Sequence, residues 1–127
     1  MGVLQTLVCP LPLCLILSGA APPAAADTAA PLRSFAICAG RLSAVMEHQW
    51  LNDGPGSEVT ARSRDAMLDL VEAVLPPEQA ATALHWRIEA KAAQKALLTR
   101  ATFTQDPIAA RRSAELIEGC LGLIGQT

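Results

Sequence analysis

The amino-acid sequence predicts an all-α protein, a small up-down-up-down four-helix bundle closed by one disulfide. Three observations support this prediction. Apolar residues recur every three or four positions in four segments, which is the period of an amphipathic helix, and no segment alternates with period two. Short stretches rich in Gly, Pro or Asp separate the segments, and short turns favour antiparallel neighbours. Two cysteines, Cys38 and Cys120, fall in the first and last segments.

The first 26 of the 127 residues predict a secretory signal peptide. They contain no charged residue, residues 3–21 are apolar, and Ala24–Ala26 supplies small side chains for cleavage. Two alternatives stay open: an uncleaved anchor, which the prolines disfavour, and a lipoprotein signal, in which a leucine precedes Cys14 where a small residue belongs. We expect a signal peptide at residues 1–26 and one helical domain at residues 27–127, in the periplasm or secreted.

The first helix is expected to run from about Pro31 to Asn52, after a short flexible lead. Proline suits a first helical turn because its missing N–H would have no partner there. The Gly- and Pro-containing stretch after Asn52 ends the helix, since Gly tolerates positive φ and Pro breaks the hydrogen-bond ladder. Trp50 continues the apolar stripe, so we expect it in the core. The stripe consists of Phe35, Cys38, Leu42, Val45, Met46 and Trp50.

The second helix is expected to begin with Ser57 as its N-cap and to end before Pro76. The third extends from about Pro77 to Thr102 or Thr104. Its expected inward face is Ala80, Ala81, Leu84, Ile88, Ala92, Leu97, Leu98 and Ala101, with Lys91, Lys95 and Arg100 outward.

The fourth helix is expected to begin at Asp106-Pro107, a capping residue followed by a first-turn proline, and to end at Gly122 or Gly125. Its expected buried residues are Ile108, Ala110, Leu116, Ile117, Cys120, Leu121 and Ile124.

Cys38 and Cys120 are expected to form a structural disulfide. In a bundle of alternating helices, the start of the first helix and the end of the fourth lie at the same end. Exported domains commonly carry such bridges. Two buried free thiols, or a redox-active or metal-binding pair, are the alternatives. The sequence has no C-x-x-C motif to support redox chemistry.

Four residues are candidates for contacts with a ligand or partner: Arg41, His48, Trp86 and Arg87. Gly40 could admit a close neighbour, or shape a small anion pocket with Arg41 and Ser43; a surface ion pair with a Glu is the simpler expectation for this arginine. Trp86 beside Arg87 could form a contact hot spot, against ordinary packing over a helix groove.

The histidines do not predict a shared metal or acid–base site. The rise of about 1.5 Å per residue separates His48 and His85 along their helices, so each is expected as a partly exposed helix residue. Other patterns typical of catalysis or metal binding are missing, since the chain has no G-x-S-x-G, H-E-x-x-H or P-loop motif.

The function expected from these features is that of a non-catalytic binding or accessory protein, with a protein partner in the cell envelope. The net charge of −2 is dispersed and gives no footprint for nucleic acid or for an anionic membrane. No cofactor is predicted, nor stable membrane insertion after cleavage. The alternative is a periplasmic carrier or sensor for a small ligand or metal held between the helices. An enzyme ranks third.

Overall fold

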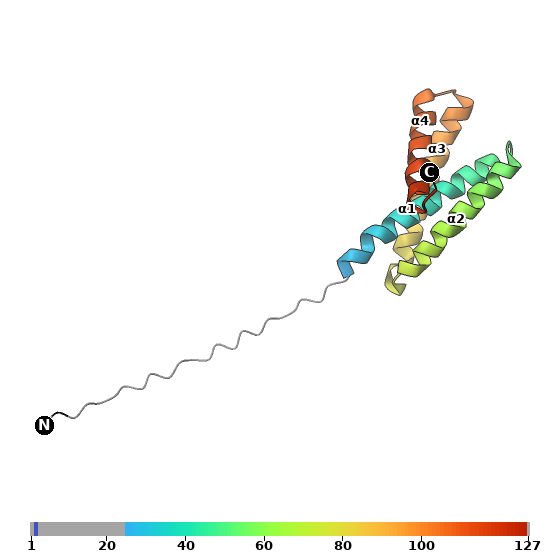
Figure 1. Ribbon diagram of the computed structural model, residues 1–127. Coiled ribbons are helices and arrows are strands. Elements are labelled where there is room, and N and C mark those ends of the chain that lie inside the picture. The colour runs from blue at the N-terminus through green and yellow to red at the C-terminus, as the bar shows by residue number, and fades with distance from the viewer. Residues whose placement is uncertain (1, 3–24, 127) are drawn as a thin grey trace.

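The protein is an all-α, up-down-up-down four-helix bundle, as the computed structural model of residues 2 and 25–126 shows (Figure 1). Within this part of the chain no strand is present. Each helix reverses the direction of the one before it, which confirms the predicted fold. The elements are α1 (Ala25–Gln49), α2 (Gly54–Val74), the short 3-10 helix η1 (Pro77–Gln79), α3 (Ala80–Phe103) and α4 (Pro107–Leu123).

The predicted signal peptide lies outside the described residues, apart from Gly2 and the first two residues of α1. Over residues 25–126, none of the helices combines the length and the apolar character that a membrane span requires.

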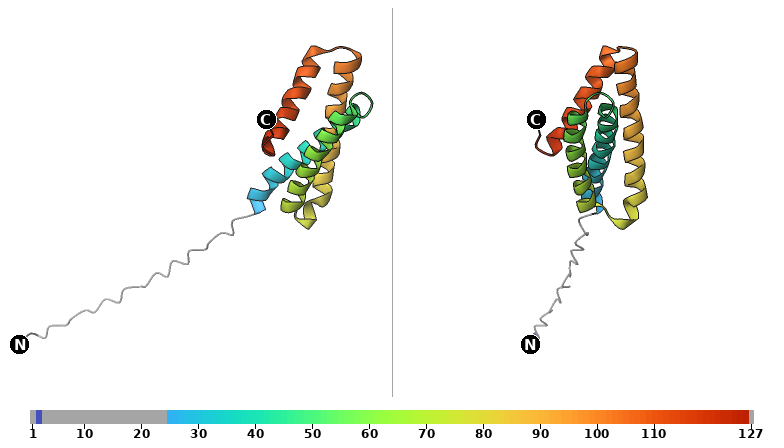
Figure 2. Two further views of the ribbon diagram at one scale, coloured as in Figure 1. Left: turned by 45° about the vertical axis from the view of Figure 1, so that its right-hand side comes forward. Right: turned by 90° about the vertical axis from the view of Figure 1, so that its right-hand side faces the viewer.

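Helix α1 is the centre of the bundle. It packs along α2 on one side and along α3 on the other, whereas α4 pairs with α3 and meets α1 over a shorter stretch. The hairpins α1–α2 and α3–α4 therefore cross each other and diverge, as the views in Figures 1 and 2 show. The α1–α2 turn and the α3–α4 turn lie at the same end, away from the start of α1. We call this the distal end, defined by residues 50–53 and 104–106.

Helix α1 begins at Ala25, six residues before the predicted start, so the expected flexible lead is wrong. Pro31 lies inside the helix and not in its first turn. Alanines supply most of the residues just before it, and alanine has the highest helix propensity, which favours extending the helix upstream. Cys38 consequently lies in the middle of α1 and not near its start.

Local capping fixes the other helix boundaries. Asp53, and not Ser57, caps α2, because its carboxylate accepts a hydrogen bond from the Gly56 amide at 2.9 Å. Ser57 is buried, and its hydroxyl donates to the Met46 carbonyl across the turn. Asp106 caps α4 as predicted, accepting from the amides of Ile108 and Ala109.

The C-terminus of α4 ends in a Schellman motif. Gly125 takes a positive φ of 70°, and its amide donates to the Gly122 carbonyl. The Gln126 amide donates to the Leu121 carbonyl, which completes the motif. One of the two glycines predicted to end the helix therefore occupies the left-handed position.

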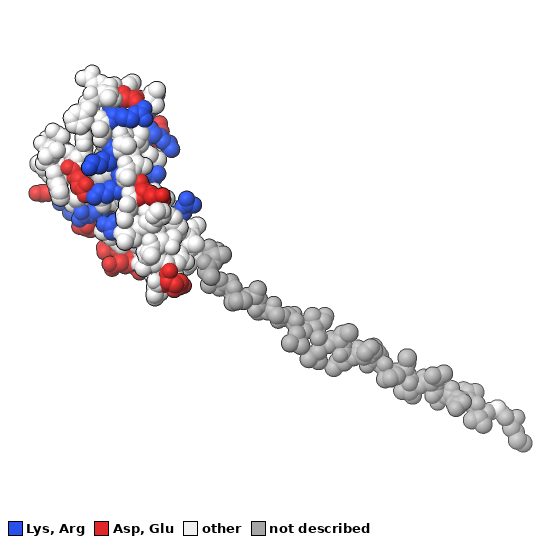
Figure 3. Space-filling view, turned by 180° about the vertical axis from the view of Figure 1, so that it is seen from behind, with Lys and Arg blue, Asp and Glu red and all other residues white. Residues whose placement is uncertain are grey.

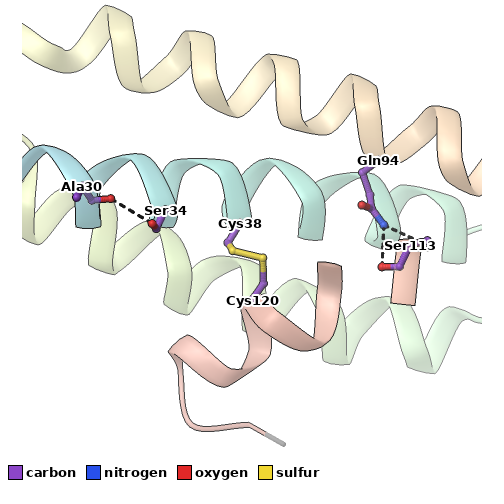
Figure 4. The surroundings of a disulfide bond; sticks show 6 residues. All are labelled: Ala30, Ser34, Cys38, Gln94, Ser113 and Cys120. Atoms are coloured by element: carbon purple, nitrogen blue, oxygen red, sulfur yellow. Dashed lines mark hydrogen bonds between the residues drawn. A yellow bond between two sulfur atoms is a disulfide. The ribbon is translucent and has the colours of Figure 1, made fainter. Parts of the chain in front are cut away.

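The Cys38–Cys120 disulfide joins the middle of α1 to the end of α4, with the two Cα atoms 5.4 Å apart (Figure 4). Both cysteines are buried in a cluster with Ala39, Leu42 and Met67. A second cluster of Leu32, Ala36 and Ala83 lies nearer the start of α1. The bridge closes a loop spanning 82 positions. Because Cys38 belongs to the α1–α2 hairpin and Cys120 to the α3–α4 hairpin, it links the two hairpins covalently.

Gly40 sets the distance between α1 and α3. A methyl group at this position would overlap the backbone carbonyl oxygen of Arg87 and would lie 3.1 Å from the amide nitrogen of Lys91. The glycine therefore lets the backbones of α1 and α3 meet directly. This agrees with the prediction that Gly40 admits a close neighbour.

This close approach also decides which face of α3 is inward. The buried residues are Ala83 and Gln94, whereas Leu84 and Ile88, predicted to face inward, are exposed. Because the small residue Ala83 and the Arg87 backbone face α1, the larger side chains of Leu84 and Ile88 lie on the surface of α3. The prediction for the first half of this helix was therefore wrong.

Gln94 forms a buried polar contact between α3 and α4. Its amide nitrogen donates to the Ser113 hydroxyl at 2.7 Å (Figure 4). Its amide oxygen is buried with no hydrogen-bond partner among the described residues. A polar contact of this kind favours one register of α4 on α3 over alternatives, since sliding the helices would leave both groups unpaired.

Candidate functional site

A cleft of about 360 Å³ opens between α1 and α3 at the distal end. The diverging hairpins create it: α1 and α3 touch at Gly40 and separate towards their C-terminal ends. Its volume is within the range of small-molecule sites in proteins. We call it the distal cleft, and it is lined by Ala44, Glu47, His48, Leu51, Asn52, Lys95, Leu98, Thr99, Thr102 and Phe103.

Large apolar side chains stand exposed around the mouth of the distal cleft. Leu51, in the turn after α1, is 87% exposed, and Phe103, the last residue of α3, is 79% exposed, although both line the cleft. Trp50, next to Leu51, is 66% exposed, so its predicted place in the core was wrong. The physical reason is that α1 ends at Gln49, and the following turn takes Trp50 out of the helical stripe. Ile108, at the start of α4 and outside the lining of the cleft, is 69% exposed, so its predicted burial was also wrong.

Polar groups line the wall of the distal cleft between these apolar residues. The Nε2 atom of His48 lies 3.2 Å from the Thr102 hydroxyl, so a hydrogen bond bridges α1 and α3. The side-chain amide of Asn52 donates to the His48 carbonyl. The Thr102 contact holds the histidine ring across the cleft, and the Asn52 contact holds the backbone at the end of α1.

The charged residues that line the distal cleft are Glu47 and Lys95, which have opposite charges. Lys91 forms an ion pair with Glu47, and both side chains are about one-third exposed. Lys95, one turn further along α3, makes no ion pair with any described residue. Lys91 lies outside the cleft lining, and because it neutralises Glu47, the ammonium group of Lys95 is left without an acidic partner in the cleft. Figure 3 shows the basic side chains gathered near the middle of one face, with acidic groups around them.

Arg41 and Trp86, two of the predicted contact residues, line one shallow groove between α1 and α3. Trp86 is half-buried and packs on the second core cluster. The guanidinium of Arg33 lies 5.7 Å from its ring centroid, a cation–π contact. The indole therefore packs over a helix groove, the simpler of the two expectations.

Arg41 also lines a second groove, beside the disulfide, between α1 and α4. Burial, and secondly the positive charge of Arg112, hold the pKa of its guanidinium below the usual value. Arg41 does not form the expected surface ion pair with any described residue. The nearby Glu115 is paired instead with Arg112, whose Nη1 atom lies 3.5 Å from the Oε2 atom of Glu115. Ser43 is buried, donates to the Ala39 carbonyl and faces a different groove, so it builds no pocket with Arg41.

Arg87 lies apart from both sites. Its carbonyl faces Gly40, and its half-buried side chain lines grooves on the α2 side of α3. The four predicted contact residues are thus distributed over three places: His48 in the distal cleft, Arg41 with Trp86, and Arg87 alone.

The two histidines lie in different environments. His85 is exposed and 3.3 Å from Glu89, whereas His48 is half-buried in the distal cleft. No group of three or more His, Cys, Asp or Glu side chains within the described part of the chain is arranged to hold a metal ion.

Comparison of the chain with protein-family models, with curated proteins and with solved structures finds no significant match. The site is therefore interpreted from its own geometry.

Sequence reasoning identified His48 but missed the rest of the distal cleft. Leu51 and Phe103 follow or end helical segments, and a helical period says nothing about residues in a turn. The one sequence feature that could have indicated the cleft is Lys95, four residues after Lys91 and so on the same face of α3. Its importance follows only from the crossing of the helices.

Proposed function

We propose that this protein is an exported, non-catalytic binding protein that acts as a small accessory subunit in the cell envelope. The single observation that carries the proposal is the distal end, where Trp50, Leu51 and Phe103 expose large apolar surfaces beside a cleft. Clustered apolar exposure is costly in water and marks interaction sites, and aromatic residues are enriched in protein interfaces.

The disulfide supports a location outside the reducing cytoplasm. Such bridges persist in oxidising compartments and are rare in the cytosol. Together with the apolar, uncharged residues at the start of the sequence, the bridge supports export to the periplasm or beyond. There it would hold the crossed hairpins, and so the distal cleft, in one arrangement.

A quantitative pull-down tests the accessory role. The tagged mature chain is incubated with envelope extract, and the proteins retained are measured by mass spectrometry. A partner in near-stoichiometric amount is expected with the wild type and lost with Phe103→Ser. Ile88→Ser is the matched control, because Ile88 is also exposed, at 57%, but lies outside the distal cleft. Equal capture by both variants would contradict the assignment of the distal end.

A second candidate function is a periplasmic carrier or sensor for a small ligand bound between the helices. The specific observation in its favour is the concave shape of the distal cleft, which combines an apolar wall with a few polar groups. Its location between two helices matches a common position of ligand sites in bundles.

A further inference from the structure

We propose that the distal cleft binds a free medium-chain carboxylic acid, with its chain against the apolar wall and its carboxylate on Lys95. This inference rests on the second candidate function and names its ligand class. It assigns the cleft to an amphiphile with one negative charge.

The apolar part of the ligand is set by the two ends of the cleft. Of its apolar lining, Ala44 is buried and Leu98 half-buried, whereas Leu51 and Phe103 are exposed. An alkyl chain lying along this line would cover Leu51 and Phe103, which are otherwise exposed to water. Each methylene removed from water contributes to affinity, so the chain supplies most of the binding free energy.

The head group is set by charge. Lys91 is neutralised by Glu47, whereas Lys95 lacks an acidic partner among residues 25–126. A ligand carboxylate would supply the acidic partner that Lys95 lacks. A charged hydrogen bond to an ammonium is stronger than one between neutral groups. The Thr99 hydroxyl, one turn from Lys95, lines the same wall and could donate a second hydrogen bond.

A free acid fits better than a bilayer lipid. The cleft has a volume of about 360 Å³ and lies between two helices, so it accommodates one short chain and not the two chains of a phospholipid. A cationic amphiphile is expected to bind more weakly, because Lys95 repels its head group and Glu47, the carboxylate of the lining, is already paired with Lys91.

Isothermal titration calorimetry with decanoate, below its micellar concentration, tests this proposal. Decyltrimethylammonium and decanol serve as ligands with the same chain and a different head. Decanoate is expected to bind at one site, and the other two at least about tenfold more weakly. Lys95→Glu should weaken decanoate about tenfold or more, and Leu51→Ser should weaken all three ligands. Arg62→Glu, an exposed charge reversal on α2 outside the cleft, should leave decanoate binding unchanged.

Each outcome has one meaning. Equal binding of the three ligands, or decanoate binding that Lys95→Glu leaves unchanged, would overturn the carboxylate inference while keeping a ligand site in the cleft. Binding that Leu51→Ser does not alter would place the site elsewhere and overturn the proposal. Absence of binding by all three would overturn the proposal, but not a carrier function for a ligand of another chemical class. The accessory role is tested separately by the pull-down with Phe103→Ser.

Discussion

Replacing Gly40 by alanine tests the crossing on which the bundle and its cleft depend. The added methyl group would overlap the carbonyl oxygen of Arg87 and would lie 3.0 Å from its carbonyl carbon. Both atoms belong to the backbone of α3, so no side-chain rotation can relieve the overlap. Helix α1 must move away from α3, and the packing around the crossing is lost along with it.

The expected cost follows from two opposing terms. Overpacking of this kind costs about 1–3 kcal/mol, and contact with rigid backbone on two residues places it at the upper end. Alanine in a helix interior is more favourable than glycine by about 1 kcal/mol. The net loss in the free energy of unfolding is therefore about 2 kcal/mol, or a fall in Tm of about 8–16 °C for a domain of this size.

Thermal unfolding followed by circular dichroism measures this loss. Gly119→Ala is the matched control, because a methyl group on this exposed glycine of α4 meets nothing within 4 Å. The control should gain about 1 kcal/mol or less from helix propensity alone. If Gly40→Ala stabilised the protein as much as Gly119→Ala does, α1 and α3 could not meet through this glycine, and the origin of the distal cleft would need another explanation.

Three further predictions concern stability. The double variant Cys38→Ser/Cys120→Ser should lose about 4 kcal/mol in urea unfolding, since the chain-entropy model assigns this much to a loop of 82 positions; an unchanged midpoint would refute it. Gln105 links α3 to α4 with a φ of 51°, so Gln105→Gly should raise the Tm slightly and Gln105→Val should lower it; the reverse order would contradict this backbone conformation. Hydrogen bonds from the Ala109 amide and from Arg100 hold the pKa of Asp106 below its usual 3.8, so its stabilising effect is present above that pH and is lost as the pH falls below it. Asp106→Asn should therefore show a smaller loss of Tm on acidification below pH 3.8 than the wild type, and parallel curves would exclude this cap as a contributor.

Local sequence signals predicted the fold well. Proline at position 76, the Asp106-Pro107 pair and the glycines at the end of α4 each act within a few residues of their position, so their effects could be derived without a structure. The disulfide was predicted from helix order, with Cys38 near the start of the first helix; the bridge is confirmed, but it joins the middle of α1 to the end of α4.

The inward face of α3 could not be derived in this way. A helix rich in alanine has nearly the same character all round, so apolar periodicity favoured the line through Leu84 and Ile88. The inward face of α3 depends on Gly40, more than forty positions before Arg87. Because Gly40 has no side chain, the Arg87 backbone can lie directly against α1. The contact between Gly40 and the Arg87 backbone decides which face of α3 points inward. A single sequence gives no sign of this contact between distant residues.

The candidate site was missed for a related reason. The prediction that Trp50 is buried assumed a first helix that runs to Asn52, whereas α1 ends three residues earlier, at Gln49, and Trp50 lies in the turn that follows. Phe103 was not considered as a contact residue because nothing near it in sequence resembles a site. Only the crossing of the two hairpins brings it to the same cleft as Leu51.

The central claim is that the protein binds its partner through the distal end, and site-specific photo-cross-linking in intact cells tests this most directly. A photoreactive phenylalanine analogue is introduced at position 103 or, as a control, at position 88, which is exposed on the same helix outside the distal cleft. A discrete cross-linked product from position 103 and none from position 88 is the expected result. Cross-linking from position 88 with none from position 103 would contradict the claim and place the binding surface elsewhere on α3.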